Sequence, residues 1–151
     1  MHETRLQTRW TDFDKLGHVT HAAYPVYFDE ARDAFLTATV GPFEEFPWVI
    51  AHVSIDYERE IVHPARQVVV RTQVTDVGRT SVTFEQHVAG SEGGIAATSR
   101  SVLVAWDETA RAARPIAEEE RAKLLRRDAD LARDEHALDL GAVVQHDDVG
   151  G

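Results

Sequence analysis

The sequence contains no cysteine among its 151 residues, which excludes disulfide bonds and thiolate chemistry. It also lacks any apolar run long enough to span a membrane, so we expect no membrane partner. The first five residues, MHETR, include no long apolar segment of the kind that secretory signal peptides carry. Together these absences predict a cytoplasmic protein.

Positive charge is scarce in this chain. It has 16 Lys and Arg residues against 26 Asp and Glu residues, a net charge of −10. Binding to nucleic acid depends on cationic surface that displaces counterions from phosphates, so we expect no nucleic-acid partner. Much of the negative charge lies between residues 118 and 148, and the remainder of the chain can still offer local positive charge to a phosphate-bearing ligand.

The hydrophobic patterns predict one strand, one helix and then four strands. Residues 4–11 alternate as in a strand. Residues 22–39 predict a helix that starts between residues 21 and 24, because Pro25 fits only a first turn, and that Gly41-Pro42 ends. Its predicted buried stripe comprises Ala23, Tyr27, Ala31, Phe35 and Ala38, with Phe28 beside it.

The four later strands are predicted over residues 48–61, 67–77, 80–89 and 95–106. Gly78-Arg79 and the glycine-rich residues 90–94 separate the last three, and such short connections imply antiparallel hairpins. In the first of these strands, one face is expected to be apolar and comprises Val49, Ala51, Val53, Ile55, Tyr57 and Ile61.

This order of elements is typical of an α+β fold. The sheet has an apolar face to cover, and only one long apolar helix is predicted. We therefore predict a five-stranded antiparallel sheet wrapped around one long central helix, the hotdog arrangement; the pattern alone leaves other α+β layouts open. We assign residues 1–116 to this domain, 117–134 to a charged C-terminal helix with its helical pattern over 117–132, and 135–151 to a flexible acidic tail.

Ionisable side chains gather where the first loop leads into the helix. The segment from Asp12 to Tyr24 contains two carboxylates, a glycine, two histidines and a tyrosine. A helix N-terminus offers unpaired N–H groups and the positive end of a dipole. This combination can place a base beside a site that stabilises an oxyanion.

The spacing Asp-x-Asp-x-x-Gly-x-Val-x-His-x-x-Tyr resembles the signature of hotdog-fold acyl-CoA thioesterases of the 4-hydroxybenzoyl-CoA thioesterase type. The resemblance extends in looser form over residues 4–116 and implies hydrolysis of an acyl-CoA or acyl carrier protein thioester, with no cofactor besides the coenzyme A of the substrate. Edge-to-edge joining of two sheets in that family implies a homodimer or homotetramer. The matching positions are Asp12, Asp14, Gly17, Val19, His21 and Tyr24.

The resemblance assigns catalytic roles to three residues. Asp14 is expected to act as general base or nucleophile, since an Asp is ionised near neutral pH; the alternative is that it caps a turn or the helix start. His21 is expected to bind or activate the thioester. The Tyr24 N–H is expected to contribute to the oxyanion site, because Pro25 has no N–H. Asp12 is interpreted as a structural loop residue that holds backbone N–H groups or Arg9.

Four further residues are expected to shape or bind the substrate. Gly17 is expected to adopt a positive φ angle in the loop, and His18 lies beside it. Arg59 and Arg79 are predicted at strand ends or turns, where they can contact coenzyme A phosphates or simply be solvated. The histidines and carboxylates of the loop also have the right ligand types for a metal, but no third cluster follows, so we expect none.

Three alternative functions remain open at this point. The first is a binding protein that holds an acyl thioester without hydrolysing it. The second is a hotdog hydratase or dehydratase, which usually pairs His with Asp or Glu at other positions. The third is a partner-binding module that uses the acidic segment 118–148.

Overall fold

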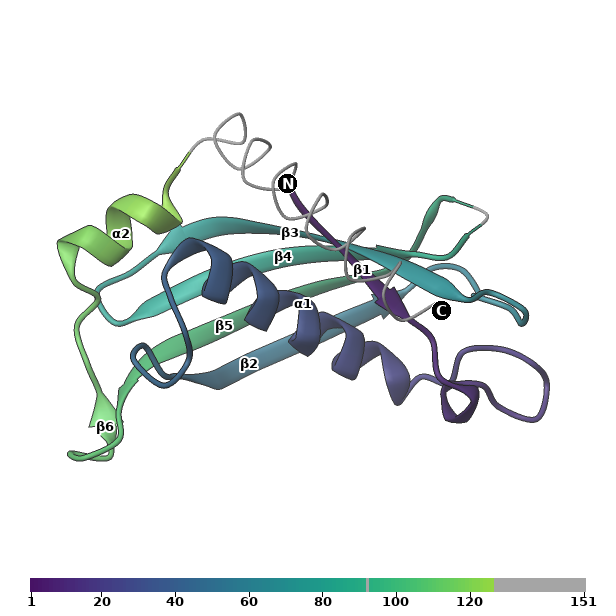
Figure 1. Ribbon diagram of the computed structural model, residues 1–151, viewed down its shortest axis with the longest axis horizontal. Helices are drawn as coiled ribbons and strands as arrows, with labels where there is room; N and C mark the ends of the chain where they lie inside the picture. Colours follow the sequence, from purple (N-terminus) through teal and green to yellow (C-terminus); the bar gives the residue numbers. More distant parts are fainter. Residues whose placement is uncertain (92, 127–151) are drawn as a thin grey trace, which may run out of the picture.

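A computed structural model describes residues 1–91 and 93–126 of the chain (Figure 1). Its strands are β1 (His2–Gln7), β2 (Trp48–Tyr57), β3 (Gln67–Val77), β4 (Ser81–Ala89), β5 (Ile95–Asp107) and β6 (Ala112–Ala113). Its helices are a short 3-10 turn, η1 (Trp10–Asp12), then α1 (Ala23–Thr39) and α2 (Glu118–Leu124). The predicted order of one strand, one apolar helix and four strands is therefore present.

The strands form one antiparallel sheet in the order β1-β3-β4-β5-β2, with β6 paired to β5. The last three predicted strands are connected as hairpins, as expected. β2 does not pair with β3, however, but crosses to the far edge and pairs with β5. The two-residue strand β6 was not predicted, because two residues are too few for an alternating pattern.

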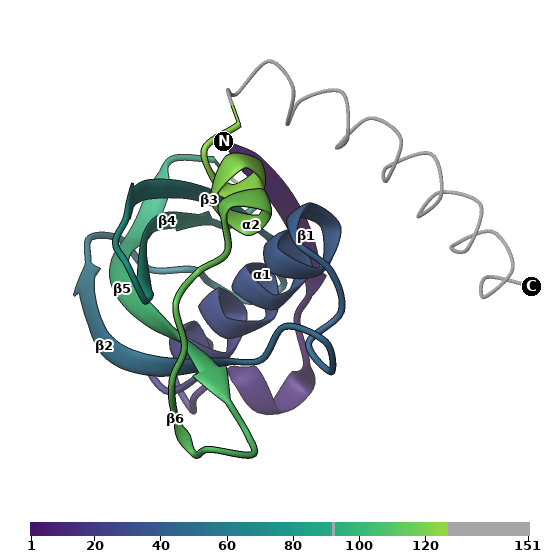
Figure 2. The same ribbon diagram turned by 90° about the vertical axis from the view of Figure 1, so that its left-hand side faces the viewer.

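α1 lies in the concave side of the curved sheet, which bends around it (Figure 2). Its 17 residues span about 25 Å. The buried face matches the predicted stripe except at its end, where Thr39 is buried and Ala38 is exposed. Steps of three and of four from Phe35 both stay near one face of the helix, so the spacing alone could not choose between Ala38 and Thr39.

Three strand and helix ends differ from their predictions by four residues or more. β1 ends at Gln7, because the chain then turns into η1. β2 ends at Tyr57, since the N–H groups of Glu58 and Arg59 both donate to the carbonyl of Ala96 and the chain leaves the ladder. α2 ends at Leu124, where only the first part of the predicted helix 117–132 is formed; residues 127–151, including the predicted tail, lie outside the described residues.

β2 is an edge strand, and only part of its predicted apolar face is buried: Ile55 packs against the core, and Ile61, just beyond the strand, is 3% exposed. A register shift between Ile50 and His52 interrupts the alternation. The exposed fractions are 52% for Ile50, 42% for Val53 and 51% for Tyr57, and among residues 1–91 and 93–126 β2 has a neighbouring strand on one side only. Val53 and Tyr57 of the predicted apolar face are thus exposed, and β2 presents apolar side chains to the outside.

α2 packs on the end of the sheet opposite the start of α1 (Figure 1). Leu124 belongs to a buried hydrophobic cluster that also includes Phe35, Val82 and Phe84. Arg121 donates to the carbonyls of Val77 and Gly78 at the β3–β4 turn. Glu120 and Arg114 form an ion pair of 3.0 Å between side chains that are 8% and 21% exposed. None of the helices in the described ranges is long and apolar enough to cross a membrane.

Candidate active site

The loop between η1 and α1 folds back on itself as a small hairpin. Phe13 and Val19 form a bridge, and the Asp14 N–H donates to the carbonyl of His18 at 2.8 Å. Gly17 closes the turn with φ of 78°, a left-handed conformation that side-chain-bearing residues adopt at a cost. The expected positive φ at Gly17 is confirmed.

The Asp14 carboxylate is partly used to hold this loop. Its Oδ1 accepts the backbone N–H of Leu16 at 2.9 Å and that of His18 at 3.0 Å. Within the described residues its Oδ2 makes no hydrogen bond, and the residue is exposed. Asp14 thus caps the turn through Oδ1, as the alternative interpretation expected, while Oδ2 remains accessible to a ligand.

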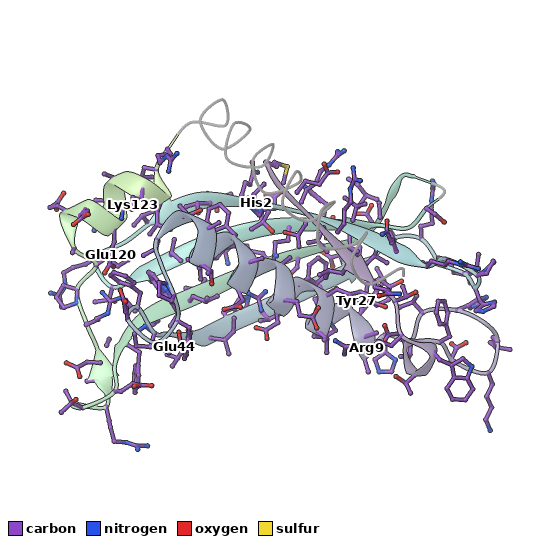
Figure 3. The ribbon with its side chains drawn as sticks, viewed as in Figure 1. His2, Arg9, Tyr27, Glu44, Glu120 and Lys123 are labelled. Carbon is purple, nitrogen blue, oxygen red and sulfur yellow. The ribbon has the colours of Figure 1, made fainter. Side chains whose placement is uncertain are left out.

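Asp12 has the structural role that the sequence suggested. Its Oδ2 accepts the N–H of Arg9 at 2.8 Å, which caps η1, and the hydroxyl of Tyr27 at 2.7 Å, which ties the loop to α1. Burial, together with the hydrogen bond to Asp12, raises the pKa of Tyr27 well above its ordinary value. Arg9 and Tyr27 lie at the same end of the molecule, far from Glu120 on α2 (Figure 3).

The loop docks onto the segment that follows β2. The Val19 N–H donates to the carbonyl of Ile61 at 2.8 Å, and the His63 N–H donates to that of Gly17 at 2.7 Å. His18 Nε2 lies 3.5 Å from Glu60 Oε2, with both side chains partly exposed. These contacts hold His18 and the Asp14 loop beside residues 60–63.

The start of α1 leaves backbone donors unoccupied. Its N-cap is Ala22, which has no side chain able to cap the helix. The Ala23 N–H donates to the carbonyl of Thr20 at 3.0 Å, and Pro25 has no N–H. The Tyr24 N–H lies in the first turn, where no earlier carbonyl of the helix can accept it. It is therefore free to donate to an oxyanion.

His21 and Tyr24 lie on this turn but differ in environment. The His21 side chain is exposed, whereas the Tyr24 ring is only 3% exposed and contacts the rings of Tyr27 and Tyr57 edge-on. Burial is the main cause that raises the pKa of Tyr24 above its ordinary value of 10.0. The ring of Tyr24 is thus a packing group, and only its backbone N–H is a candidate for chemistry.

Sequence reasoning missed Tyr57, which contacts this turn from the sheet. Its hydroxyl donates to the His21 carbonyl at 3.2 Å, and its ring lies 5.1 Å from that of Tyr24 at 90°. In the sequence Tyr57 belongs to the alternating apolar face of a strand. The only available signal was its hydroxyl, which apolar patterning ignores.

The two predicted phosphate-binding arginines lie at opposite ends of the sheet. Arg59 follows β2 near the Asp14 loop, and its guanidinium lies against Gly94. Arg79 lies in the β3–β4 turn, where its carbonyl accepts the Ile116 N–H and where the neighbouring Gly78 contacts α2. A single chain therefore brings Arg59, but not Arg79, to the same end as Asp14 and His21.

A groove of about 320 Å³ runs between α1 and β2, a size within the usual range for small-molecule sites. Arg32 lies in its wall and is 5% exposed. The Arg32 Nη1 donates to Gln86 Oε1 at 3.0 Å. The wall also carries the carboxylates of Asp29, Glu30 and Asp33, and its apolar part includes Leu36, Phe43, Phe46, Trp48, Ile50 and Leu103. Across the described ranges, no cluster of three or more His, Asp or Glu side chains is arranged to hold a metal ion.

A curved antiparallel sheet wrapped around one helix, with a polar loop leading into the helix start, is the hotdog-type fold of thioester hydrolases. The chain belongs to the thioesterase-like superfamily, whose family model matches residues 8–124. No curated protein matches the sequence.

Solved structures of thioesterases have the same fold. A predicted thioesterase from Bacillus stearothermophilus has a TM-score of 0.74 at 26% identity, over 82% of this chain and 92% of that one. A thioesterase from Thermus thermophilus, complexed with coenzyme A and Zn, has a TM-score of 0.72 at 28% identity, over 81% and 90%. The BH1999 gentisyl-coenzyme A thioesterase, at 21% identity and a TM-score of 0.72 over 81% and 98%, shows the fold alone.

Proposed function

We propose that this protein is an acyl-CoA thioesterase of the 4-hydroxybenzoyl-CoA thioesterase type, acting in the cytoplasm. The observation that supports this most directly is the Asp14 carboxylate, whose Oδ1 is fixed by two backbone N–H groups while its Oδ2 makes no hydrogen bond in the described residues. The Asp14 loop leads directly into the uncapped N-terminus of α1. A fixed carboxylate near helix-terminal donors is suited to thioester hydrolysis, which uses a base or nucleophile and donors to the oxyanion.

In the proposed reaction Asp14 acts as general base or nucleophile on the thioester carbonyl. As general base it takes a proton from water while the water oxygen attacks the carbonyl carbon. The Tyr24 N–H and the helix dipole stabilise the oxyanion. The C–S bond then breaks, the thiolate takes up the proton, and a carboxylic acid and a free thiol result. The exposed His21 ring assists by positioning water or by donating a proton to the leaving thiolate.

The substrate is proposed to be a coenzyme A thioester, because a solved thioesterase of the same fold is complexed with coenzyme A. Arg59, at the same end as the Asp14 loop, is the proposed contact for its phosphates, while Gly17 and His18 shape the loop beside it. Arg79 would reach the same ligand only from a second copy of the chain. The chemistry assigned to these residues needs no cofactor besides the coenzyme A of the substrate.

A panel of acyl-CoAs of different chain length, together with one acyl carrier protein thioester, tests the activity. Release of free thiol from at least one acyl-CoA, abolished in Asp14→Asn, is expected. Because Asp14 Oδ1 also holds the loop, a non-hydrolytic binding protein is the second candidate. Tight acyl-CoA binding without thiol release would favour it. Release of water from, or its addition to, the acyl chain would instead indicate a hydratase.

A further inference from the structure

The carbonyl of His21 lacks the hydrogen-bond donor that a helix start normally supplies. Ala22 already has helical dihedral angles, φ of −70° and ψ of −19°. In a regular helix the carbonyl of His21 would therefore accept the backbone N–H of the residue four positions later. That residue is Pro25, which has no N–H. The first turn of α1 is therefore open at this carbonyl unless another group donates to it.

The sheet supplies that donor. The Tyr57 hydroxyl donates to the His21 carbonyl at 3.2 Å from the end of β2. The backbone of Tyr57 is itself fixed, because it pairs with Ala97 in β5 and the next two N–H groups both donate to Ala96. The Tyr57 ring is further held edge-on by the buried ring of Tyr24 at 5.1 Å. The end of β2 thus holds in place the turn that bears His21 and Tyr24.

Because a peptide group is planar and trans, its carbonyl and its N–H point in opposite directions. Holding the His21 carbonyl toward Tyr57 therefore also fixes the direction of the Ala22 N–H and the position of the His21 Cα. This single peptide plane therefore sets the direction of the Ala22 N–H and the position from which the His21 side chain extends, two residues before the Tyr24 N–H of the proposed oxyanion site.

We propose that Tyr57 is a positioning residue of the active site, whose hydroxyl replaces the N–H that Pro25 lacks and orients the His21–Ala22 peptide toward the thioester. This inference rests on the proposed function, since it gives the helix start a role in catalysis. It assigns Tyr57 no contact with the reacting atoms.

Tyr57→Phe keeps the ring and removes only the donor. We expect kcat to fall about tenfold while KM stays within about twofold, because the oxyanion donors matter more in the transition state than in the ground state. Pro25→Ala restores an N–H at the position that can reach the His21 carbonyl. We expect it to be near wild type alone and to recover most of the lost kcat when combined with Tyr57→Phe.

Tyr27→Phe is the matched control, because it removes another hydroxyl from the same tyrosine cluster, one that binds Asp12 instead of the helix start. Its kcat is expected to stay within about twofold. An unchanged kcat in Tyr57→Phe, an equal loss in Tyr27→Phe, or no recovery in the double variant would each overturn the proposal.

A measurement without substrate separates this proposal from the proposed function. The Ala22 amide resonance, followed by NMR, should shift in Tyr57→Phe and return toward its original position in the double variant. If no acyl thioester is hydrolysed but the resonance behaves in this way, the proposed function fails and the contact stands. If thioesters are hydrolysed and the resonance does not move, the positioning role of Tyr57 fails.

Discussion

At Asp14 the two carboxylate oxygens have different surroundings, and this difference predicts the effect of mutation. Asp14→Asn keeps an oxygen that can accept the N–H groups of Leu16 and His18, so the loop should fold. It removes the negative charge needed to attack the carbonyl or to accept a proton. We expect kcat for the best acyl-CoA to fall at least ~10²-fold, or roughly 2.7 kcal/mol in transition-state free energy, with binding retained.

The matched control for Asp14→Asn is Asp12→Asn, at the neighbouring carboxylate that holds Arg9 and Tyr27. This change is expected to lower the melting temperature more than it lowers kcat. A folded Asp14→Asn variant that turns over at nearly the wild-type rate would remove Asp14 from the mechanism.

The His21 side chain is exposed and its backbone, not its ring, holds the turn. His21→Ala should therefore leave stability nearly unchanged. We expect kcat to fall less than in Asp14→Asn, since general acid–base assistance typically contributes ~10²-fold or somewhat more. Steady-state kinetics with the same acyl-CoA measure this directly, and an activity within about twofold of wild type would show that the ring takes no part.

Arg32 and Gln86 form a buried polar pair between α1 and the sheet. Gln86 is fully buried; its Oε1 accepts from Arg32, and its Nε2 donates to the Phe28 carbonyl and Thr72 Oγ1 at 3.0 Å each. Gln86→Leu would leave a buried guanidinium and a buried carbonyl without these partners. We expect a loss of about 2–4 kcal/mol in the free energy of unfolding.

Chemical denaturation measures the effect of Gln86→Leu, with Gln73→Leu on the neighbouring strand β3 as control. Gln73 is only partly buried and makes no side-chain hydrogen bond within the described residues, so its replacement should change stability by less than about 0.5 kcal/mol. Equal stabilities of the two variants would mean that the buried pair contributes nothing net.

At the scale of elements, the burial of two tyrosines of α1 makes stability sensitive to alkaline pH. Burial raises the pKa of both Tyr24 and Tyr27 above the ordinary value of 10.0. The folded protein therefore keeps protons that the unfolded chain releases. The stability due to these groups is present below pH 10 and is lost progressively as pH rises above it.

Unfolding measured between pH 8 and 11 should show this fall, and Tyr27→Phe should reduce its slope by up to about 1.4 kcal/mol per pH unit, the value for one proton. The variant should be less stable than wild type at neutral pH, because Asp12 loses a partner. The same slope in both proteins would contradict the assignment of this titration to Tyr27.

At the scale of the whole molecule, the open edge of β2 predicts self-association. Ile50, Val53 and Tyr57 expose apolar surface along a strand that has one neighbour only. Such an edge readily pairs with another strand, and a second copy is the partner that the family resemblance suggests. We expect a homodimer, or a homotetramer built from it.

Sedimentation at micromolar concentration tests this expectation, and a single species of 16.9 kDa would contradict it. Val53→Lys places a charge on the edge and should shift the protein toward monomer. Thr75→Lys is the control, because Thr75 is exposed on β3, which β4 and β5 separate from the edge of β2. It should leave the assembly unchanged.

The sequence alone determined those features that depend on local pattern and chemistry. The spacing of apolar residues located α1, and alternation with glycine turns located β3, β4 and β5 nearly to the residue. The loop motif also predicted Gly17, whose positive φ follows from the turn, and Asp12, whose short side chain holds nearby N–H groups. These features are decided within a few residues of chain.

Only the tertiary structure decided which distant segments meet. Alternation cannot tell an edge strand from a central one, so the pairing of β2 with β5 and the exposure of Val53 could not be predicted. Arg59 and Arg79 were equivalent in sequence, yet the length of the sheet separates them. Tyr57 reaches His21 from 36 residues away, and such a contact exists only because the curved sheet brings the end of β2 to the start of α1.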